Sequence, residues 1–298
     1  MNPLSRRKFL KTTLAVGTLS SVNTLHLQAS ARAASDVVPL GKSGMNVTRL
    51  AFGTGSNNGY VQAGLGQKEF TRLVHYAYDR GIRFFETAES YVTPAMLGEA
   101  LKGIPRDSYR LMTKVTTDEG AGPQIDPQKR FDEMRRTSQT EYFDIMLLHW
   151  QHTADWAAQT GRWQEGILEA QSKKIIRTRG ASVHGLPALR QVPGNKWLEV
   201  AMIRMNHNGT RMDGPTYQDN NNPASVSEVV EHVKRVKQEG MGVISMKLIG
   251  NGAFTRHEDR QAAMRFAFKN AGIDCAAVGF KSTQEIDEAI DNLNLALA

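Results

Sequence analysis

Several features are scarce or missing in this chain of 298 residues, and each absence excludes some kinds of structure or function. It has a single cysteine, Cys275, which excludes a disulfide within the chain, and the apolar neighbours of Cys275 predict a buried, unreactive thiol. No uninterrupted run of eighteen apolar residues follows the N-terminal region, so no membrane anchor is expected there. His184 and His207 have no second ligand at metal-binding spacing, and we expect no metal site.

The chain also lacks a block of like charge beyond its N-terminus. Its formal net charge is +7, but the first 34 residues contain five basic residues and no acidic one. The remaining chain is therefore only slightly basic. Because a nucleic-acid surface needs lysine and arginine clustered on one face, we expect no nucleic-acid partner.

The N-terminal region has the pattern of a twin-arginine signal peptide. Arg6 and Arg7 precede a modestly apolar stretch, residues 12–25, and residues 29–34 offer Ala-x-Ala cleavage sites. The apolar stretch is too short and too polar to span a bilayer. A basic, disordered tail is the alternative. We therefore expect residues 1–34 to be a cleavable signal that engages the twin-arginine export machinery and delivers an already folded protein to the periplasm.

The remaining residues, 35–298, alternate apolar strand-like runs with amphipathic segments and predict a single domain. Residues 67–80 and 226–238 repeat apolar side chains at helical spacing, and a glycine follows each closely. The strand-like runs are residues 50–55, 83–88, 109–115, 143–150, 175–183, 198–205, 242–250 and 275–281. Eight strands, each followed by a helix, predict an α/β fold of the (β/α)8 TIM-barrel type. A hairpin is expected over residues 38–47, and residues 205–223 are expected to form a loop at the barrel mouth.

Polar side chains gather where three successive strands end, which is where such barrels place their active sites. They are Glu86 with nearby Tyr91, then Lys114, then His149. A carbonyl that accepts hydride develops negative charge on oxygen and needs a proton there. Tyr91 can donate that proton, and a neighbouring Lys114 ammonium is expected to lower the pKa of the phenol, with Glu86 holding Lys114 in place. His149 can orient the carbonyl oxygen, and a nicotinamide cofactor can supply the hydride.

These residues lie in motifs that resemble the aldo-keto reductase family. Residues 81–91 read Gly-Ile-Arg-Phe-Phe-Glu-Thr-Ala-Glu-Ser-Tyr, and Leu-Gly-Glu-Ala-Leu follows at 97–101. Leu-Met-Thr-Lys ends at Lys114, and Asp-Ile-Met-Leu-Leu-His ends at His149. The resemblance covers nearly the whole chain after residue 37. It implies a (β/α)8 barrel that reduces aldehydes and ketones with NADPH, and a catalytic tetrad of Glu86, Tyr91, Lys114 and His149.

The resemblance also implies cofactor contacts, and here the sequence departs from the family. The implied contacts are Gly53, Thr54, Ser182, Met246, Gly279, Lys281 and Ser282, and Lys247 is expected to face either the cofactor phosphates or solvent. Departures from the family pattern are Glu86 for aspartate, Val183 for asparagine, Met202 for glutamine, Met246 for tyrosine and Glu285 for arginine. Lys281 is left as the cation for a 2′-phosphate, so NADP is expected as cofactor, with NAD as the alternative.

Other interpretations stay open. Tyr60, Trp150 and Trp156 either line a substrate pocket or simply pack against neighbours. Glu86 and Lys114 can form a purely structural ion pair, and the chain can be a non-catalytic exported barrel that keeps the fold and some cofactor binding. A barrel isomerase or lyase with Lys114 as a Schiff base would leave Tyr91 without a role.

Overall fold

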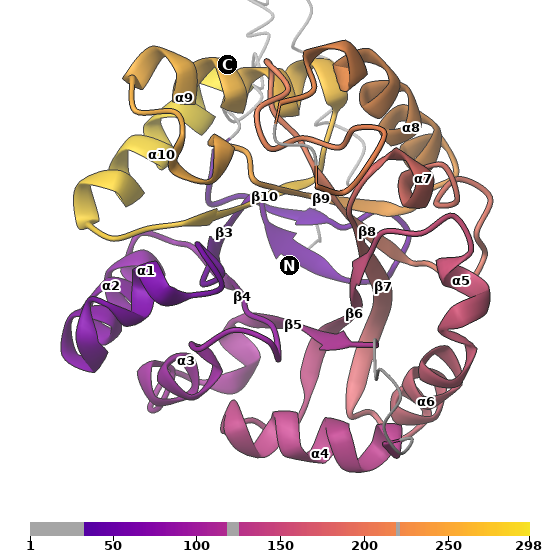
Figure 1. Ribbon diagram of the computed structural model, residues 1–298. Coiled ribbons are helices and arrows are strands. Elements are labelled where there is room, and N and C mark those ends of the chain that lie inside the picture. The colour runs from indigo at the N-terminus through magenta and orange to yellow at the C-terminus, as the bar shows by residue number, and fades with distance from the viewer. Residues whose placement is uncertain (1–32, 118–124, 219–220) are drawn as a thin grey trace, which may run out of the picture. The chain divides into compact units, whose positions relative to one another are not determined.

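Eight parallel strands close into a barrel with helices around it, in the computed structural model of the chain (Figure 1). The structure describes residues 33–117, 125–218 and 221–298, so the predicted signal peptide lies outside the described residues except for Ala33 and Ala34. Around the barrel the strand order is β10-β3-β4-β5-β6-β7-β8-β9. The strands are β3 (Leu50–Gly53), β4 (Phe84–Glu86), β5 (Arg110–Thr116), β6 (Phe143–Gln151), β7 (Ile176–Val183), β8 (Val200–Arg204), β9 (Gly242–Met246) and β10 (Cys275–Gly279). The predicted (β/α)8 fold is confirmed.

Helices form the outer layer, and most of them bury one apolar face against the strands. The α-helices are α1 (Tyr60–Ala63), α2 (Gly66–Asp79), α3 (Pro94–Ala100), α4 (Pro127–Thr137), α5 (Trp156–Gln159), α6 (Gly161–Ser172), α7 (Leu186–Leu189), α8 (Val226–Gln238), α9 (His257–Arg265) and α10 (Thr283–Leu297). A π-helical turn, Phe266–Ala271, follows α9, and short 3-10 turns lie at Arg106–Ser108, Pro223–Ser225 and Gly250–Gly252. Figure 1 shows the longer helices outside the ring of strands.

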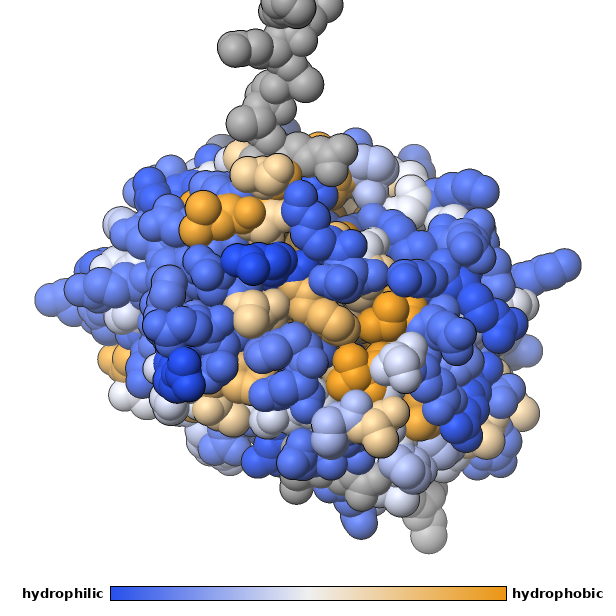
Figure 2. Space-filling model, turned by 90° about the horizontal axis from the view of Figure 1, so that it is seen from above, coloured by the Kyte–Doolittle hydropathy of each residue, from blue (hydrophilic) through white to orange (hydrophobic). Residues whose placement is uncertain are grey.

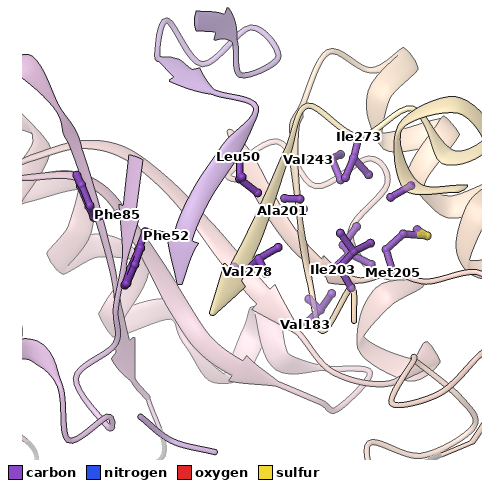
Figure 3. Packing of buried hydrophobic residues seen from close by; sticks show 14 of the residues in the cluster. Leu50, Phe52, Phe85, Val183, Ala201, Ile203, Met205, Val243, Ile273 and Val278 are labelled. Carbon is purple, nitrogen blue, oxygen red and sulfur yellow. The ribbon is translucent and has the colours of Figure 1, made fainter. Parts of the chain in front are cut away.

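Side chains alternate between two apolar layers along each strand, because successive residues of a strand point to opposite faces. On β4, Phe84 belongs to the cluster inside the barrel, and Phe85 belongs to the cluster between strands and helices. Figure 3 shows the outer cluster, in which Phe52, Phe85 and Val278 come from neighbouring strands. This alternation decides which polar residues can reach the barrel mouth.

The expected N-terminal hairpin is present and packs at the amino ends of the strands. Strand β1 (Val37–Pro39) pairs antiparallel with β2 (Asn46–Thr48). Leu40, in the turn, is fully buried in the inner cluster, and the Lys42 N–H donates to the Gly240 carbonyl at 2.7 Å, just before β9. A Cβ at Gly242 would lie 2.6 Å from Leu40 Cγ, so this close approach needs a glycine. Apolar packing thus fills the amino end of the barrel.

Two expected elements differ in the structure. The expected strand 242–250 ends at Met246, because Lys247 adopts the left-handed conformation with φ 54° and turns the chain away from the sheet. Between β7 and β8 the helix is only the four residues of α7, with proline at positions 187 and 193 restricting helix growth.

No described helix is long and apolar enough to cross a membrane. The face shown in Figure 2 is mostly hydrophilic, with its apolar residues in limited patches.

Candidate active site at the barrel mouth

Inward-facing positions near the carboxyl ends of several strands carry polar side chains. Phe84 lies in the inner cluster, so Glu86, two residues further along β4, also points inward. The same step of two leads from Met112 to Lys114 on β5 and from Leu147 to His149 on β6. Parallel pairing aligns these strand ends, with Lys114 opposite Leu147 and Thr116 opposite His149. The structure therefore brings the predicted acid, amine and imidazole to one mouth.

Lys114 is the centre of this group. It is 1% exposed, and its ammonium donates hydrogen bonds to Glu86 Oε1, to the Thr87 carbonyl at 2.9 Å and to Tyr91 Oη at 3.3 Å. A buried ammonium is stable only when its charge is compensated, and Glu86, 3% exposed, supplies that charge. The longer side chain of Glu86 thus reaches Lys114, as expected from the sequence.

Tyr91 is positioned by a close approach to Gly55 that was not predicted from the sequence. A Cβ at Gly55 would lie 2.6 Å from Tyr91 Oη, so the phenol packs directly on the backbone at position 55. Gly53 similarly makes room for Glu86, since a Cβ there would lie 3.2 Å from Glu86 Oε2. Any larger residue at position 55 would displace the phenol from Lys114.

The expected direction of the Tyr91 pKa was wrong. Burial first, and then the negative charge of Glu86, raise the pKa of Tyr91 well above its usual range. Burial also lowers the pKa of Lys114, and Glu86 opposes that shift. The longer carboxylate therefore acts on both neighbours, and it cancels the effect that a lone ammonium would have on the phenol. Tyr91 remains protonated, which suits a proton donor.

His149 faces Tyr91 across the mouth as a neutral ring. The ring centroids are 5.7 Å apart, and His149 Nδ1 lies 3.2 Å from Ser90 Oγ. Burial, followed by the positive charges of Lys114 and Lys247, lowers the pKa of His149 well below its usual range. A neutral imidazole can donate a hydrogen bond from one nitrogen without acting as an acid.

A cavity of about 1000 Å³ connects this group with the ends of β8, β9 and β10. Among the residues expected to contact a cofactor, Gly53, Met246, Lys247, Gly279 and Lys281 line it. The other three lie next to it. Ser182 is fully buried with its hydroxyl unpaired among the described residues, Thr54 is buried and accepts from Thr93 Oγ1 at 2.9 Å, and Ser282 caps α10.

The α10 end of the cavity holds a self-contained polar network. Ser282 Oγ accepts from the Glu285 N–H at 3.2 Å, and Glu285 Oε2 accepts from the Lys281 N–H at 2.8 Å. The Lys281 ammonium is 3.9 Å from Glu285 Oε1. Nearby, Arg260 pairs with Glu288 at 2.5 Å. The carboxylate of Glu285 thus lies at the helix N-terminus, where an incoming phosphate would otherwise be favoured.

The three aromatic candidates have different surroundings. Trp150 is 41% exposed, lines the cavity and lies 5.2 Å from the Tyr217 ring. Tyr60 is 61% exposed and is not among the residues that line the cavity, although its neighbours Val61 and Gln62 are. Trp156 is fully buried in the outer core.

Sequence reasoning missed a second polar group across the mouth. Arg204, the last residue of β8, is 6% exposed and points inward two positions after Met202. Its Nε lies 3.6 Å from Asp213 Oδ1, and its guanidinium donates to the Tyr217 carbonyl at 3.3 and 3.4 Å. Arg204 is the only charged residue within β8, and that was the available signal.

The chain is thus a (β/α)8 barrel with a tyrosine, a lysine, a carboxylate and a histidine gathered at one mouth. The chain belongs to the aldo/keto reductase family, whose model matches residues 49–294.

Individual relatives are distant. Methylglyoxal reductase DkgB of Salmonella typhi is 27% identical over 120 residues, 40% of this chain and 44% of that protein. The chain spans less than half the length of this relative and of a matched Glycine max relative. Aldo-keto reductase AKR11C1 of Bacillus halodurans in its holo form has a TM-score of 0.67 at 17% identity, covering 88% of this chain and 95% of that one. An aldo-keto reductase of Klebsiella pneumoniae in complex with NADPH has a TM-score of 0.64 at 16% identity, covering 87% and 89%. At these identities the structures support the fold alone.

Proposed function

We propose that this protein is a nicotinamide-dependent oxidoreductase that reduces an aldehyde or ketone to an alcohol. The observation that carries the proposal is the contact of Lys114 with both Glu86 and Tyr91, with His149 facing Tyr91 across the same cavity. A purely structural ion pair would not need a phenol within hydrogen-bond reach of its ammonium. Nor would it need a glycine at position 55 to make room for that phenol. A Schiff-base role for Lys114 is disfavoured, because its nitrogen is buried and already makes three hydrogen bonds.

Each residue has one task in this reaction. His149 donates a hydrogen bond to the carbonyl oxygen and orients it. Tyr91 gives its proton to that oxygen as negative charge develops, and Lys114 then stabilises the phenolate that is left. Glu86 keeps Lys114 charged and fixed. The cofactor, when bound, supplies the hydride. Because the raised pKa of Tyr91 favours the protonated phenol, the site is better suited to reduction than to alcohol oxidation at neutral pH.

The residues present fit a nicotinamide dinucleotide. The buried, unpaired hydroxyl of Ser182 offers a partner for a carboxamide, and Met202 and Met246 give an apolar floor on neighbouring strands. Lys281 would bind the adenosine end. We propose NADP as the cofactor, with Lys281 at the 2′-phosphate, and NAD as the alternative, since Glu285 places negative charge at the same position.

Mixing the purified protein with NADPH or NADH and a panel of small aldehydes and ketones tests this function. We expect a fall in absorbance at 340 nm that depends on the carbonyl compound, with the alcohol as product. Tyr91→Phe, purified in parallel, controls for contaminating reductases. Cofactor binding in the absence of any turnover would contradict the proposal and favour a non-catalytic barrel.

We also propose that the N-terminal region directs twin-arginine export to the periplasm. Ala34 is 1% exposed, and its N–H donates to Asn294 Oδ1 at 2.8 Å, so it packs with the barrel. We therefore propose cleavage after Ala31 or Ala33, which leaves Ala34 in place, instead of the boundary after residue 34 that the sequence predicts. The intact mass of the periplasmic protein would test this, and a cytoplasmic protein of unprocessed mass would contradict it.

A further inference from the structure

The second polar group, on the β8–β9 side of the mouth, holds two cations, Arg204 and Lys247, and among the described residues one acid, Asp213. Arg204 and Lys247 line the same cavity as Tyr91 and His149. Asp213, the carboxylate beside Arg204, is 0% exposed. Lys247 makes no ion pair with a carboxylate of the described residues. Cations that line a cavity in excess of nearby acids attract a negatively charged ligand.

The surroundings hold Arg204 as a fixed cation. Asp213 Oδ1 accepts from the Gly185 N–H at 2.6 Å, which fixes the carboxylate, and the Tyr217 carbonyl accepts from the guanidinium. An arginine fixed from behind presents its remaining N–H groups in a planar fork that matches a carboxylate or phosphate. Burial also raises the pKa of Asp213 to about 6, so its compensation of Arg204 weakens in acid.

Lys247 lies near the catalytic end of the cavity. Burial lowers the pKa of His149, on β6, and of His184, which directly follows β7, and the charge of Lys247 lowers both further. Burial, and then the charges of Arg204 and Arg211, lower its own pKa to about 8. Such repulsion among cations is relieved when an anion binds between them. The cations at the α10 end differ, because Arg260 and Lys281 each have an acidic neighbour there.

We propose that Arg204 and Lys247 bind an anionic group of the substrate, so that the carbonyl compound reduced at Tyr91 carries a carboxylate or a phosphate. This inference rests on the proposed reductase function and specifies its substrate class. Arg204 is the last residue of β8 and pairs with Met246, the last residue of β9, and Lys247 follows Met246 directly. The anion lies across the mouth from the proton donor, and Trp150 lines the same cavity with its ring 5.2 Å from the Tyr217 ring.

Substrate pairs that differ only in charge test the proposal. Succinic semialdehyde is compared with its methyl ester, and glyceraldehyde 3-phosphate with glyceraldehyde. In the wild type we expect kcat/KM at least about tenfold higher for the charged member of one pair, the scale of one charge-assisted contact. The pair that shows the preference distinguishes carboxylate from phosphate. Equal kcat/KM within both pairs would overturn the proposal, and no turnover of any member would instead contradict the reductase function.

Variants assign the preference to residues. Arg204→Met and Lys247→Met should each lower about tenfold the ratio of kcat/KM for the charged member to kcat/KM for the neutral member. Lys247 is partly exposed and lies outside the Arg204–Asp213 pair, so its substitution tests the proposal even where loss of that pair impairs folding. The control Lys173→Met removes an exposed cation at the end of α6, just before β7 begins. It should change kcat/KM for neither the charged nor the neutral substrate. An equal loss for charged and neutral substrates, with a raised KM for NADPH, would assign these cations to the cofactor diphosphate.

A binding measurement gives a readout independent of turnover. Thermal stabilisation of the cofactor-free protein by 4-hydroxybutyrate should be seen in the wild type and lost in Lys247→Met. Stabilisation that is equal in both proteins would contradict a role for Lys247.

Discussion

The two sides of the barrel mouth differ in how their charges are compensated. On the β4–β6 side, Lys114 and Glu86 are buried and paired, and His149 is neutral. On the β8–β9 side, Asp213 is the one carboxylate that the described part of the chain places beside Arg204 and Lys247. Side chains whose charges are balanced by a neighbour suit proton transfer, because no further counter-ion has to bind before the reaction. A cation without a neighbouring acid suits binding, because its charge is available to an anionic ligand. The comparison separates the chemistry from the choice of substrate.

The largest expected effect is on the β4–β6 side. Tyr91→Phe removes the proton donor and should lower kcat by about 10²- to 10⁴-fold while cofactor affinity stays nearly unchanged. Tyr217→Phe is the matched control on the other side, since its backbone carbonyl, not its hydroxyl, holds Arg204. Steady-state kinetics with one aldehyde compare the two, and a Tyr91→Phe enzyme within a few-fold of the wild type would refute the assigned role.

Glu86 allows a finer test of the same side. Glu86→Gln removes the charge that compensates Lys114, and kcat should fall about 10- to 100-fold, each tenfold step corresponding to about 1.4 kcal/mol. Glu86→Asp keeps the charge but leaves a gap of one methylene, and the loss should be smaller. Circular dichroism checks that both variants are folded. Equal kcat in all three proteins would remove Glu86 from the chemistry, and a gain with aspartate in an inactive parent would indicate a chain that has lost catalysis.

The preference for NADPH over NADH should depend on the residues at the α10 end of the cavity and on neither side of the mouth. Lys281→Ala should weaken NADPH binding by about 1–2 kcal/mol and barely change NADH binding. Glu285→Gln removes a carboxylate 3.9 Å from that ammonium and should strengthen NADPH binding. Fluorescence titration measures both affinities. The hypothesis fails where both cofactors weaken equally, since the 2′-phosphate then lies elsewhere.

The smallest effect is a pH dependence that should appear on one side only. The raised pKa of Tyr91 keeps the phenol protonated, so kcat should be flat from pH 6 to about 9. The pKa of Lys247 is lowered to about 8, so the ammonium is present below that pH and lost above it. KM for a charged substrate should therefore rise a few-fold above pH 8, with the neutral ester unaffected. The neighbouring groups that titrate lower are Asp213, with its pKa at about 6, and His149 and His184, with theirs well below the usual value. A parallel rise in KM for both substrates would exclude Lys247 as the cause.

The residues of the β4–β6 side could be predicted because each of them lies in a regular pattern within its own strand. Each strand alternates inward and outward residues, and a step of two from an apolar inward residue reaches Glu86, Lys114 or His149. The barrel follows from eight such strands. The predicted strand ranges were less accurate where one backbone angle ends a strand. Lys247 ends β9 by adopting a positive φ, which is rare for lysine and was therefore not predicted.

The β8–β9 side could not be predicted in the same way. Asp213 lies in an irregular loop, where no periodicity indicates burial, and it meets Arg204 only in the folded chain. Gly55 and Tyr91 are far apart in the sequence, and no motif relates them, yet they are in close contact in the structure. The pKa of Tyr91 was mispredicted because burial and Glu86 together outweigh Lys114, and the extent of burial is a property of the packed structure.

Single-turnover kinetics test the division between the two sides most directly. The hydride-transfer rate and the substrate Kd are measured for wild type, Tyr91→Phe and Arg204→Met with succinic semialdehyde and its methyl ester. We predict that Tyr91→Phe slows hydride transfer equally for both substrates without changing Kd. Arg204→Met should raise Kd only for the acid and leave the rate at saturation unchanged. A slower hydride transfer with the neutral ester in Arg204→Met, or a substrate-selective loss in Tyr91→Phe, would contradict the account.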